Sequence, residues 1–521
     1  MGNIQLSQGG NSPLQTEKAY TYFIVPFYFD KLVEWKAIIS KLDRWKPVSE
    51  NLYNKEDVLY PYIMDLFQQV GTAQKQRLNI YKFVPCKEQF DAPEGRFKKT
   101  LFPERILGQQ SVAFIGKNAQ EKKNPQAIPF TLMNEGNMAP HLFVSPTAKI
   151  GIMTFCIQFD EMKDMETIKV LNYFLHKRDE RDKYQCVCPK PENQKEIDVP
   201  TEANNIFVNT SNFWKLNQYN TRFNEEYLCW STDDLVHCML ATFGQPQSGV
   251  PRIKYFSSDR IHLFTFCSLL DEDDKIKGED LYPDMLRLAR CVDNTYMLPF
   301  KQMLEEGHFM EAYDNIYFSS VIEGASMVCV GKKGNAEFIK QIHNKFSRQY
   351  LIVYLLVLIQ RFSLLRLEQV MTAFESTEKN EDDELWKLIN VICRIKVNCY
   401  YTDVSVYTHY SQFYQFCCRN LLIQQTFQEV GEKVELLKIT TDRNLQNIQK
   451  KSERLQKLLN IVVAILTVAQ VMQAVQELKS STKEINWALL AGGVCILIIF
   501  VSYLWAYFKD SVYNLFYSQE E

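Results

Sequence analysis

Two long apolar runs stand near the end of the chain, with a short polar stretch between them. The second run, residues 487–508, holds 22 residues without a charge, and a helix needs about 20 to cross a hydrocarbon core of ~30 Å. The first run, residues 458–475, holds 18 uncharged residues, which is at the short end of that range. The pattern predicts a transmembrane helical hairpin closed by residues 476–486. The alternative is a buried helical hairpin in a soluble core.

A third apolar run lies within residues 336–374. Its segment YLIVYLLVLIQRFSLLRL is as long as a membrane span, but Gln360, Arg361 and Arg366 interrupt it. Charged residues are rare in membrane spans. We therefore expect a long buried helix of the cytoplasmic part here. The alternative, a third span, would place the two ends of the chain on opposite sides of the membrane.

The segment before the first span has the pattern of a long helix. From Ser411 to Val475 the chain has no proline, and apolar residues recur at steps of three and four, as in a coiled coil. This predicts one helix of about 100 Å that continues into the first span. A helix of this length cannot bury its whole apolar stripe inside one small domain. The helix therefore needs partners, either other helices of the chain or copies of itself around an axis.

One face of the first span combines polar and small side chains. Polar groups at membrane depth normally face the interior of a bundle or a water-filled path. The sequence therefore predicts that this face lines a pore, whereas the alternative is close packing between helices through small residues and amides. The predicted pore-lining residues are Asn460, Ala464, Thr467, Gln470, Val471, Gln473 and Ala474.

Charges beside the two spans predict their orientation. More Lys and Arg residues lie before the first span and after the second than in the polar stretch between them, where each Lys is matched by a Glu. The positive-inside rule then places both ends in the cytoplasm. The N-terminal MGNIQLSQGG lacks the basic and apolar regions of a signal peptide. We expect a multi-pass protein of the cell's inner (plasma) membrane.

Composition and motifs narrow the function further. A net charge of −3 gives no general attraction to nucleic acid, and we expect no direct nucleic-acid partner. The 14 cysteines are scattered, which in a cytoplasmic chain favours small buried hydrophobic residues over disulfides. The group of Cys186, Cys188, His237 and Cys238 lacks zinc-ribbon spacing, so no metal site is predicted. Phosphate-loop, dinucleotide, zinc-protease and serine-hydrolase motifs are absent from the sequence, which argues against an enzyme.

The rest of the chain reads as an α+β region followed by helices. Strands are predicted at residues 19–30, 260–270 and on both sides of Glu323-Gly324, and residues 141–146 and 150–159 are predicted to form a β-hairpin or two adjacent strands. Residues 177–200 are predicted to form a long exposed loop or an insertion. The predicted fold class is an α+β cytoplasmic domain followed by a long stalk helix and a two-helix transmembrane hairpin. The predicted parts are a sensor domain (1–334), a helical region (335–410), the stalk helix (411–457), transmembrane helix 1 (458–475), an external loop (476–486), transmembrane helix 2 (487–508) and a cytoplasmic tail (509–521).

This order of parts resembles the CorA family of magnesium channels, over about residues 335–515. In that family five copies assemble with the first span around the pore, and a Gly-Met-Asn motif ends that span. Here Val471-Met472-Gln473 stands at the place of the motif, and only Met472 matches. The chain is more similar to the CorA-like proteins of type III CRISPR systems, which have an enlarged cytoplasmic domain and a degraded motif.

The resemblance implies a homopentameric channel that a nucleotide messenger opens, such as a conjugate of S-adenosylmethionine and AMP, in antiviral defence. A phosphate of such a ligand requires cationic partners. The candidate ligand-binding residues are Arg252, Lys254, Arg260, Lys332 and Lys333. One alternative is a constitutive transporter of divalent metal ions such as Mg²⁺ or Co²⁺. The other is a membrane-anchored interaction protein without a pore.

Overall fold

A computed structural model of the 521-residue chain separates into two compact units, Met1–Val434 and Glu435–Glu521. The predicted boundary between residues 334 and 335 falls inside the first unit. The structure describes residues 14–29, 45–47, 59–64, 67–68, 80–85, 106–115, 126–145, 148–159, 163–178, 184–189, 227–240, 253–271, 276–292, 294–313, 315–332, 336–375, 390, 393, 401–481 and 493.

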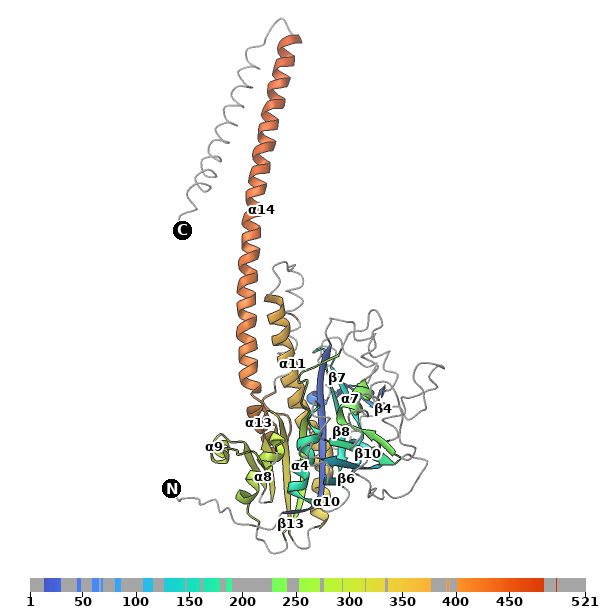
Figure 1. Ribbon diagram of the computed structural model, residues 1–521. Helices are drawn as coiled ribbons and strands as arrows, with labels where there is room; N and C mark the ends of the chain where they lie inside the picture. The colour runs from blue at the N-terminus through green and yellow to red at the C-terminus, as the bar shows by residue number, and fades with distance from the viewer. Residues whose placement is uncertain are drawn as a thin grey trace. The chain divides into compact units, whose positions relative to one another are not determined.

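The described strands join into one mixed sheet (Figure 1). Short helices lie between the strands along the chain, and the longest described helices, α11 (Leu351–Glu375) and α14 (Ile423–Ser481), come after the last strand. The strands are β1 (Gln15–Phe29), β2 (Trp45–Pro47), β3 (Phe67–Gln68), β4 (Ile80–Pro85), β5 (Gln110–Ile115), β6 (Gln126–Leu132), β7 (His141–Ser145), β8 (Ile150–Gln158), β9 (Lys163–Asp164), β10 (Tyr184–Pro189), β11 (Tyr227–Trp230), β12 (Ile253–Tyr255), β13 (His262–Asp271), β14 (Phe309–Tyr313), β15 (Ile316–Ser320) and β16 (Gly324–Lys332).

The helices include a π-helical segment, η4, and a short 3₁₀ helix, η1. In chain order they are α2 (Pro61–Met64), η1 (Gly136–Met138), α4 (Met165–Leu175), α7 (Thr232–Leu240), α8 (Gly278–Arg290), α9 (Phe300–Glu305), α10 (Ala336–Lys345), η4 (Phe346–Tyr350), α11 (Leu351–Glu375), α13 (Thr408–Asn420) and α14 (Ile423–Ser481). These described elements show a mixed α/β arrangement and no clear CorA-like one.

The sheet is built around β1, whose bulky apolar sequence was predicted to form a strand. β1 pairs antiparallel with β8 on one side and with β13 on the other. The main path of the sheet runs β11-β10-β5-β6-β8-β1-β13-β16-β15-β14. The predicted neighbouring strands at residues 141–146 and 150–159 are confirmed as the antiparallel pair β7 and β8. The strands predicted on both sides of Glu323-Gly324 are confirmed as β15 and β16, which also pair antiparallel.

The predicted loop at residues 177–200 is wrong in its middle. Residues Tyr184–Pro189 form β10, which pairs with β5 and β11 and buries Cys186. The charged residues on both sides of this short strand hid its six-residue sequence YQCVCP. Six of the other described cysteines are buried and Cys393 is exposed, so the reading of cysteines as small buried residues is largely confirmed.

Two sets of helices cover the two faces of the central strands. Alternate residues of a strand point to opposite faces, and Thr265 of β13 accordingly accepts a hydrogen bond from Asn172 of α4, at 3.0 Å. Its neighbour Phe264 faces the other side, where its ring lies 4.7 Å from that of Phe346 in η4 and 4.9 Å from that of Tyr354 in α11. The sheet is therefore the middle layer, and α11 packs against it.

One helical stretch in the described part of the chain, Lys340–Thr372, is long and apolar enough to cross a membrane. Within its most apolar part, 83% of the residues are buried inside the fold. Leu351 to Ile359 are all buried. The prediction of a long buried helix in this region is therefore confirmed.

The predicted helix from Ser411 to Val475 has a break near its start. α13 ends at Asn420, and Leu422 adopts a left-handed backbone conformation with φ of 55°, which ends a right-handed helix. α14 then runs for 59 residues without interruption, which corresponds to about 88 Å. It includes the predicted first span and the first six residues of the predicted loop, 476–481.

The second unit contains the remaining part of α14. Its described apolar side chains are largely exposed within one chain, among them Leu455, Leu458, Leu459, Val462, Val463 and Leu466. The second predicted span and the cytoplasmic tail lie outside the described residues, apart from Gly493.

Candidate functional site

Two adjoining cavities lie beside the start of β13 in the first unit. The first has a volume of about 600 Å³ and the second of about 870 Å³. Ser257, His262 and Ile322 line both of them. The two cavities therefore form neighbouring parts of one candidate ligand site.

The chain that connects β12 to β13 is held in place by its own polar side chains. Ser257 Oγ donates a hydrogen bond to Asp259 Oδ1, at 2.9 Å, and accepts one from the Arg260 backbone N–H, at 3.2 Å. The backbone N–H of Ile261 donates to the carbonyl of His176 at the end of α4, at 2.8 Å. These contacts fix the backbone of Arg260 and His262, which both line the first cavity.

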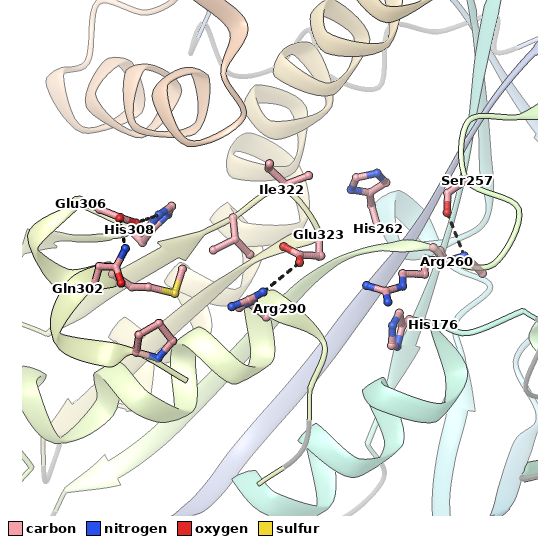
Figure 2. A pocket seen from close by; sticks show the side chains of 14 residues that line it. His176, Ser257, Arg260, His262, Arg290, Gln302, Glu306, His308, Ile322 and Glu323 are labelled. Atoms are coloured by element: carbon pink, nitrogen blue, oxygen red, sulfur yellow. Dashed lines mark hydrogen bonds and ion pairs between the residues drawn. The ribbon is translucent and has the colours of Figure 1, made fainter. Parts of the chain in front are cut away.

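The cations of the first cavity already have carboxylate partners. Arg290 Nη2 lies 3.6 Å from Glu323 Oε1 (Figure 2), and Arg260 Nε lies 3.5 Å from Asp259 Oδ2. Figure 2 shows the Arg290–Glu323 pair between the labelled groups at the two ends of the cavity. Its walls therefore offer little net positive charge to an anion.

Two histidines near the cavities are neutral at physiological pH. The pKa of His176 is lowered to about 4, mainly by burial and to a smaller extent by Lys177 and Arg260, in spite of the hydrogen bond to the Asn172 carbonyl, which raises it. Burial also lowers the pKa of His262 to about 3, with smaller effects of Arg361 and His176. The Nδ1 atom of His262 is buried and has no hydrogen-bond partner among the described residues.

The wall of the second cavity is one face of α11. Arg361, Phe362, Leu365, Glu368, Gln369 and Thr372 line it; their spacing of three to four residues places them on one side of a helix. Phe256 also lines this cavity and packs against the helix, with its ring centre 4.7 Å from that of Phe362. The cavity thus joins an aromatic surface to a row of polar groups, the usual composition of a small-molecule site.

Two polar contacts connect this wall to the region where α14 begins. Arg361 Nη1 donates a hydrogen bond to the carbonyl of Leu421, beside the break between α13 and α14. Glu368 forms an ion pair with Lys433, three turns into α14. Residues of the cavity wall therefore also hold the first turns of α14.

The predicted ligand-binding residues are not brought together. Arg260 lines the first cavity, whereas Lys254 is exposed on β12 and lines neither cavity. Lys332 ends β16, and β16 runs parallel to β13 from the level of Leu263 to that of Asp271. At about 3.3 Å per residue its backbone is roughly 26 Å from the cavity end of the strand. Arg252 and Lys333 lie outside the described residues.

The predicted pore-lining residues all lie on α14. Asn460, Thr467, Gln470 and Gln473 are exposed within one chain. The hydroxyl of Thr467 donates to the carbonyl of Val463, at 2.8 Å, so its proton is used inside the helix. The side chains of Ala464, Val471 and Ala474 lie outside the described part of the structure.

Sequence reasoning did not select His262, Arg361 or Phe362 as ligand-binding candidates. The signal for Arg361 was present, because the segment Gln-Arg-Phe interrupts an otherwise apolar run. A cation placed in a buried helix indicates a specific contact. No group of three or more His, Cys, Asp or Glu side chains that could hold a metal ion lies within the described residues.

Comparison with known proteins gives no relative from which a function could be transferred. No protein-family model, no curated protein and no solved structure matches the chain.

Proposed function

We propose that the protein is a subunit of a homo-oligomeric, pentameric membrane channel of CorA-like organisation. Its first unit binds a small nucleotide-like ligand, and binding opens a pore lined by the first of two membrane spans. A conjugate of S-adenosylmethionine and AMP is the first ligand to test, and the setting is type III CRISPR antiviral defence. Opening would let ions cross the inner membrane and depolarise the cell.

One observation carries this proposal. α14 is a single helix whose first turns contact the wall of the second cavity and whose later turns include the apolar run 458–475. An uninterrupted helix transmits a displacement of one end to the other, because its backbone hydrogen bonds resist bending. The exposed leucine and valine side chains of this run support a membrane or oligomeric environment for it.

Ion flux through the purified protein in liposomes tests the proposal. Flux is measured without ligand, with AMP, and with the S-adenosylmethionine–AMP conjugate. The double variant Gln470→Ala, Gln473→Ala removes two polar side chains of the predicted pore, and Gln446→Ala, Gln449→Ala removes two exposed amides from the same helix before the span. We expect ligand-dependent flux that the first variant changes and the second leaves unchanged.

Other outcomes would favour the two alternatives. Flux of Mg²⁺ or Co²⁺ without any ligand would favour a constitutive metal-ion transporter. The absence of flux under every condition would favour a membrane anchor without a pore. A change of flux in the Gln446, Gln449 control variant equal to that in the pore variant would remove the argument for the predicted pore face.

A further inference from the structure

The wall of the second cavity contains a cation, Arg361, for which the described residues provide no carboxylate partner. Arg361 is partly buried in α11, and no carboxylate in the described part of the chain forms an ion pair with it. The carboxylate that raises the pKa of Arg361 against the effect of burial is that of Glu323, which forms its ion pair with Arg290 instead. Burial lowers the pKa of the Arg361 guanidinium. A buried charge of this kind is costly unless something pairs with it.

The guanidinium has unused hydrogen-bonding capacity toward the cavity. Its only described hydrogen bond is from Nη1 to the Leu421 carbonyl, whereas a guanidinium carries five N–H donors. The second observation is independent of Arg361. His262 lines the same cavity, and no described residue forms a hydrogen bond with its buried Nδ1. Within the described part of the chain, both groups therefore keep hydrogen-bonding capacity that no protein group uses, at one wall of a cavity that can hold a small molecule.

We infer that the second cavity binds a small oxyanion, carrying phosphate or carboxylate oxygens, between Arg361 and His262, and that binding withdraws Arg361 from the Leu421 carbonyl. This inference rests on the proposed function in one respect, namely that the oxyanion belongs to a ligand that regulates the channel. An anionic oxygen is a stronger acceptor than a neutral carbonyl, because charge-assisted hydrogen bonds are roughly twice as strong. The guanidinium is therefore expected to exchange the carbonyl for the anion.

Loss of the hydrogen bond from Arg361 to the Leu421 carbonyl would affect the start of α14. Leu421 precedes the left-handed residue Leu422, and the Leu421 carbonyl accepts the Arg361 hydrogen bond at this break. Loss of that bond leaves the ion pair between Glu368 and Lys433 as the remaining described polar contact of the second-cavity wall with α14. Coupling of this kind is reciprocal, so a change at the α14 start also changes the affinity for the anion.

The full-length protein in detergent allows a direct test without any ion flux. Binding of inorganic pyrophosphate and of succinate is measured by calorimetry, and the two arms distinguish phosphate from carboxylate oxygens. Arg361→Gln removes the cation, and Arg361→Lys keeps the charge. Arg366→Gln is the matched control, since Arg366 lies on the same helix, donates to the Phe29 carbonyl at 3.0 Å and lines neither cavity.

We expect at least one of the two anions to bind, with at least tenfold weaker binding to Arg361→Gln and unchanged binding to Arg366→Gln. Arg361→Lys should lose less affinity than Arg361→Gln. Hydrogen–deuterium exchange of residues 421–434 should rise severalfold when the anion is added to the natural protein, and the anion should not change it in Arg361→Gln.

Three results would overturn the inference. The first is that neither anion binds at 10 mM, which is about ten times a weak dissociation constant of ~1 mM. The second is that the anion binds equally well to Arg361→Gln and to the natural protein. The third is that the anion binds at Arg361 while the hydrogen–deuterium exchange of residues 421–434 stays constant. Binding with the expected exchange but without ion flux in liposomes would reject the channel and leave the anion site in place.

Discussion

The Arg178 guanidinium and the Asp233 carboxylate form an ion pair of 2.7 Å, with side chains that are only 5% and 2% exposed. The backbone of Arg178 follows α4, and Asp233 lies in the first turn of α7. The guanidinium also stacks over the ring of Tyr255, 3.8 Å from its centre. This one side chain therefore joins α4, α7 and β12, three elements from distant parts of the sequence.

Asp233→Asn is expected to reduce the free energy of unfolding by about 3–5 kcal/mol, because it leaves a buried guanidinium without its counter-charge. Denaturant unfolding of the detergent-solubilised protein, followed by tryptophan fluorescence, measures the change. Asp259→Asn is the matched control. The pair of Asp259 with Arg260 is 49% and 55% exposed, so its loss should cost at most about 1 kcal/mol. Equal losses in the two variants would contradict a structural role for the buried pair.

Gly324→Ala is expected to destabilise the fold by about 1–3 kcal/mol, as overpacked sites usually do. A Cβ at Gly324 would lie 2.6 Å from the Leu263 carbonyl oxygen and 2.9 Å from that of Ala289. Neither backbone oxygen can move without disturbing β13 or α8. Thermal unfolding measures the effect. Ile322→Ala, at a side chain that is 45% exposed nearby, should change stability by less than about 0.5 kcal/mol. Similar melting temperatures for Gly324→Ala and the natural protein would refute the steric argument.

His176 should make the fold less stable as the pH falls below 6.5. Its pKa is about 4 in the folded protein and 6.5 in an ordinary environment. Between pH 6.5 and pH 4 the imidazole binds a proton in the unfolded chain but stays neutral in the folded chain. The free energy of unfolding is therefore highest above pH 6.5 and decreases as the pH falls. From pH 6.5 to 5, the natural protein should lose roughly 1.5–2 kcal/mol more than His176→Asn. Denaturant titrations at both pH values measure this difference, and parallel losses in the two proteins would argue against it.

Leu466→Asp should prevent stable insertion of the first span. A carboxylate in the centre of a membrane helix costs about 2.5–3.5 kcal/mol on insertion scales. Leu436→Asp is the matched control, because Leu436 lies on the same helix but outside the predicted span. The two leucine side chains are similarly exposed, Leu436 to 64% and Leu466 to 57%. Because the second predicted span would keep either variant in the membrane fraction, insertion of the first span is measured by the accessibility of residues 476–486 to a protease added on the outer side of the membrane. If both variants are cleaved there to the same extent, residues 458–475 do not form a span.

The sequence allowed the main strands to be predicted because their residues differ strongly from those around them. β1 and the β15–β16 hairpin are runs of β-branched and aromatic residues bounded by turn residues. The buried helix α11 was predicted from its length and its interrupting arginines. β10 was missed because a short strand between charged segments has little periodicity of its own.

The site was harder to predict, since its geometry depends on contacts between distant residues. The interaction of Arg361 with the Leu421 carbonyl joins residues 60 positions apart. The left-handed conformation of Leu422 could not be predicted from the sequence either, because leucine has no preference for that conformation. Among the predicted cations, Lys332 lies at the end of β16 that is far from the cavities, and Lys254 lies on β12 outside both cavities. Only the folded sheet shows this difference from Arg260.

The position of β1 in the sheet has a consequence for the order in which the chain folds during synthesis. β1 leaves the ribosome first, but one of its two long neighbours, β13, is made about 250 residues later, as the Lys18–Ser268 contact shows. Until then one edge of an apolar strand has no partner, which exposes the nascent chain to aggregation. β16 and α11 follow, and the apolar run at residues 458–475 is translated after all of them. All the described strands of the sheet are thus translated before the apolar run at residues 458–475.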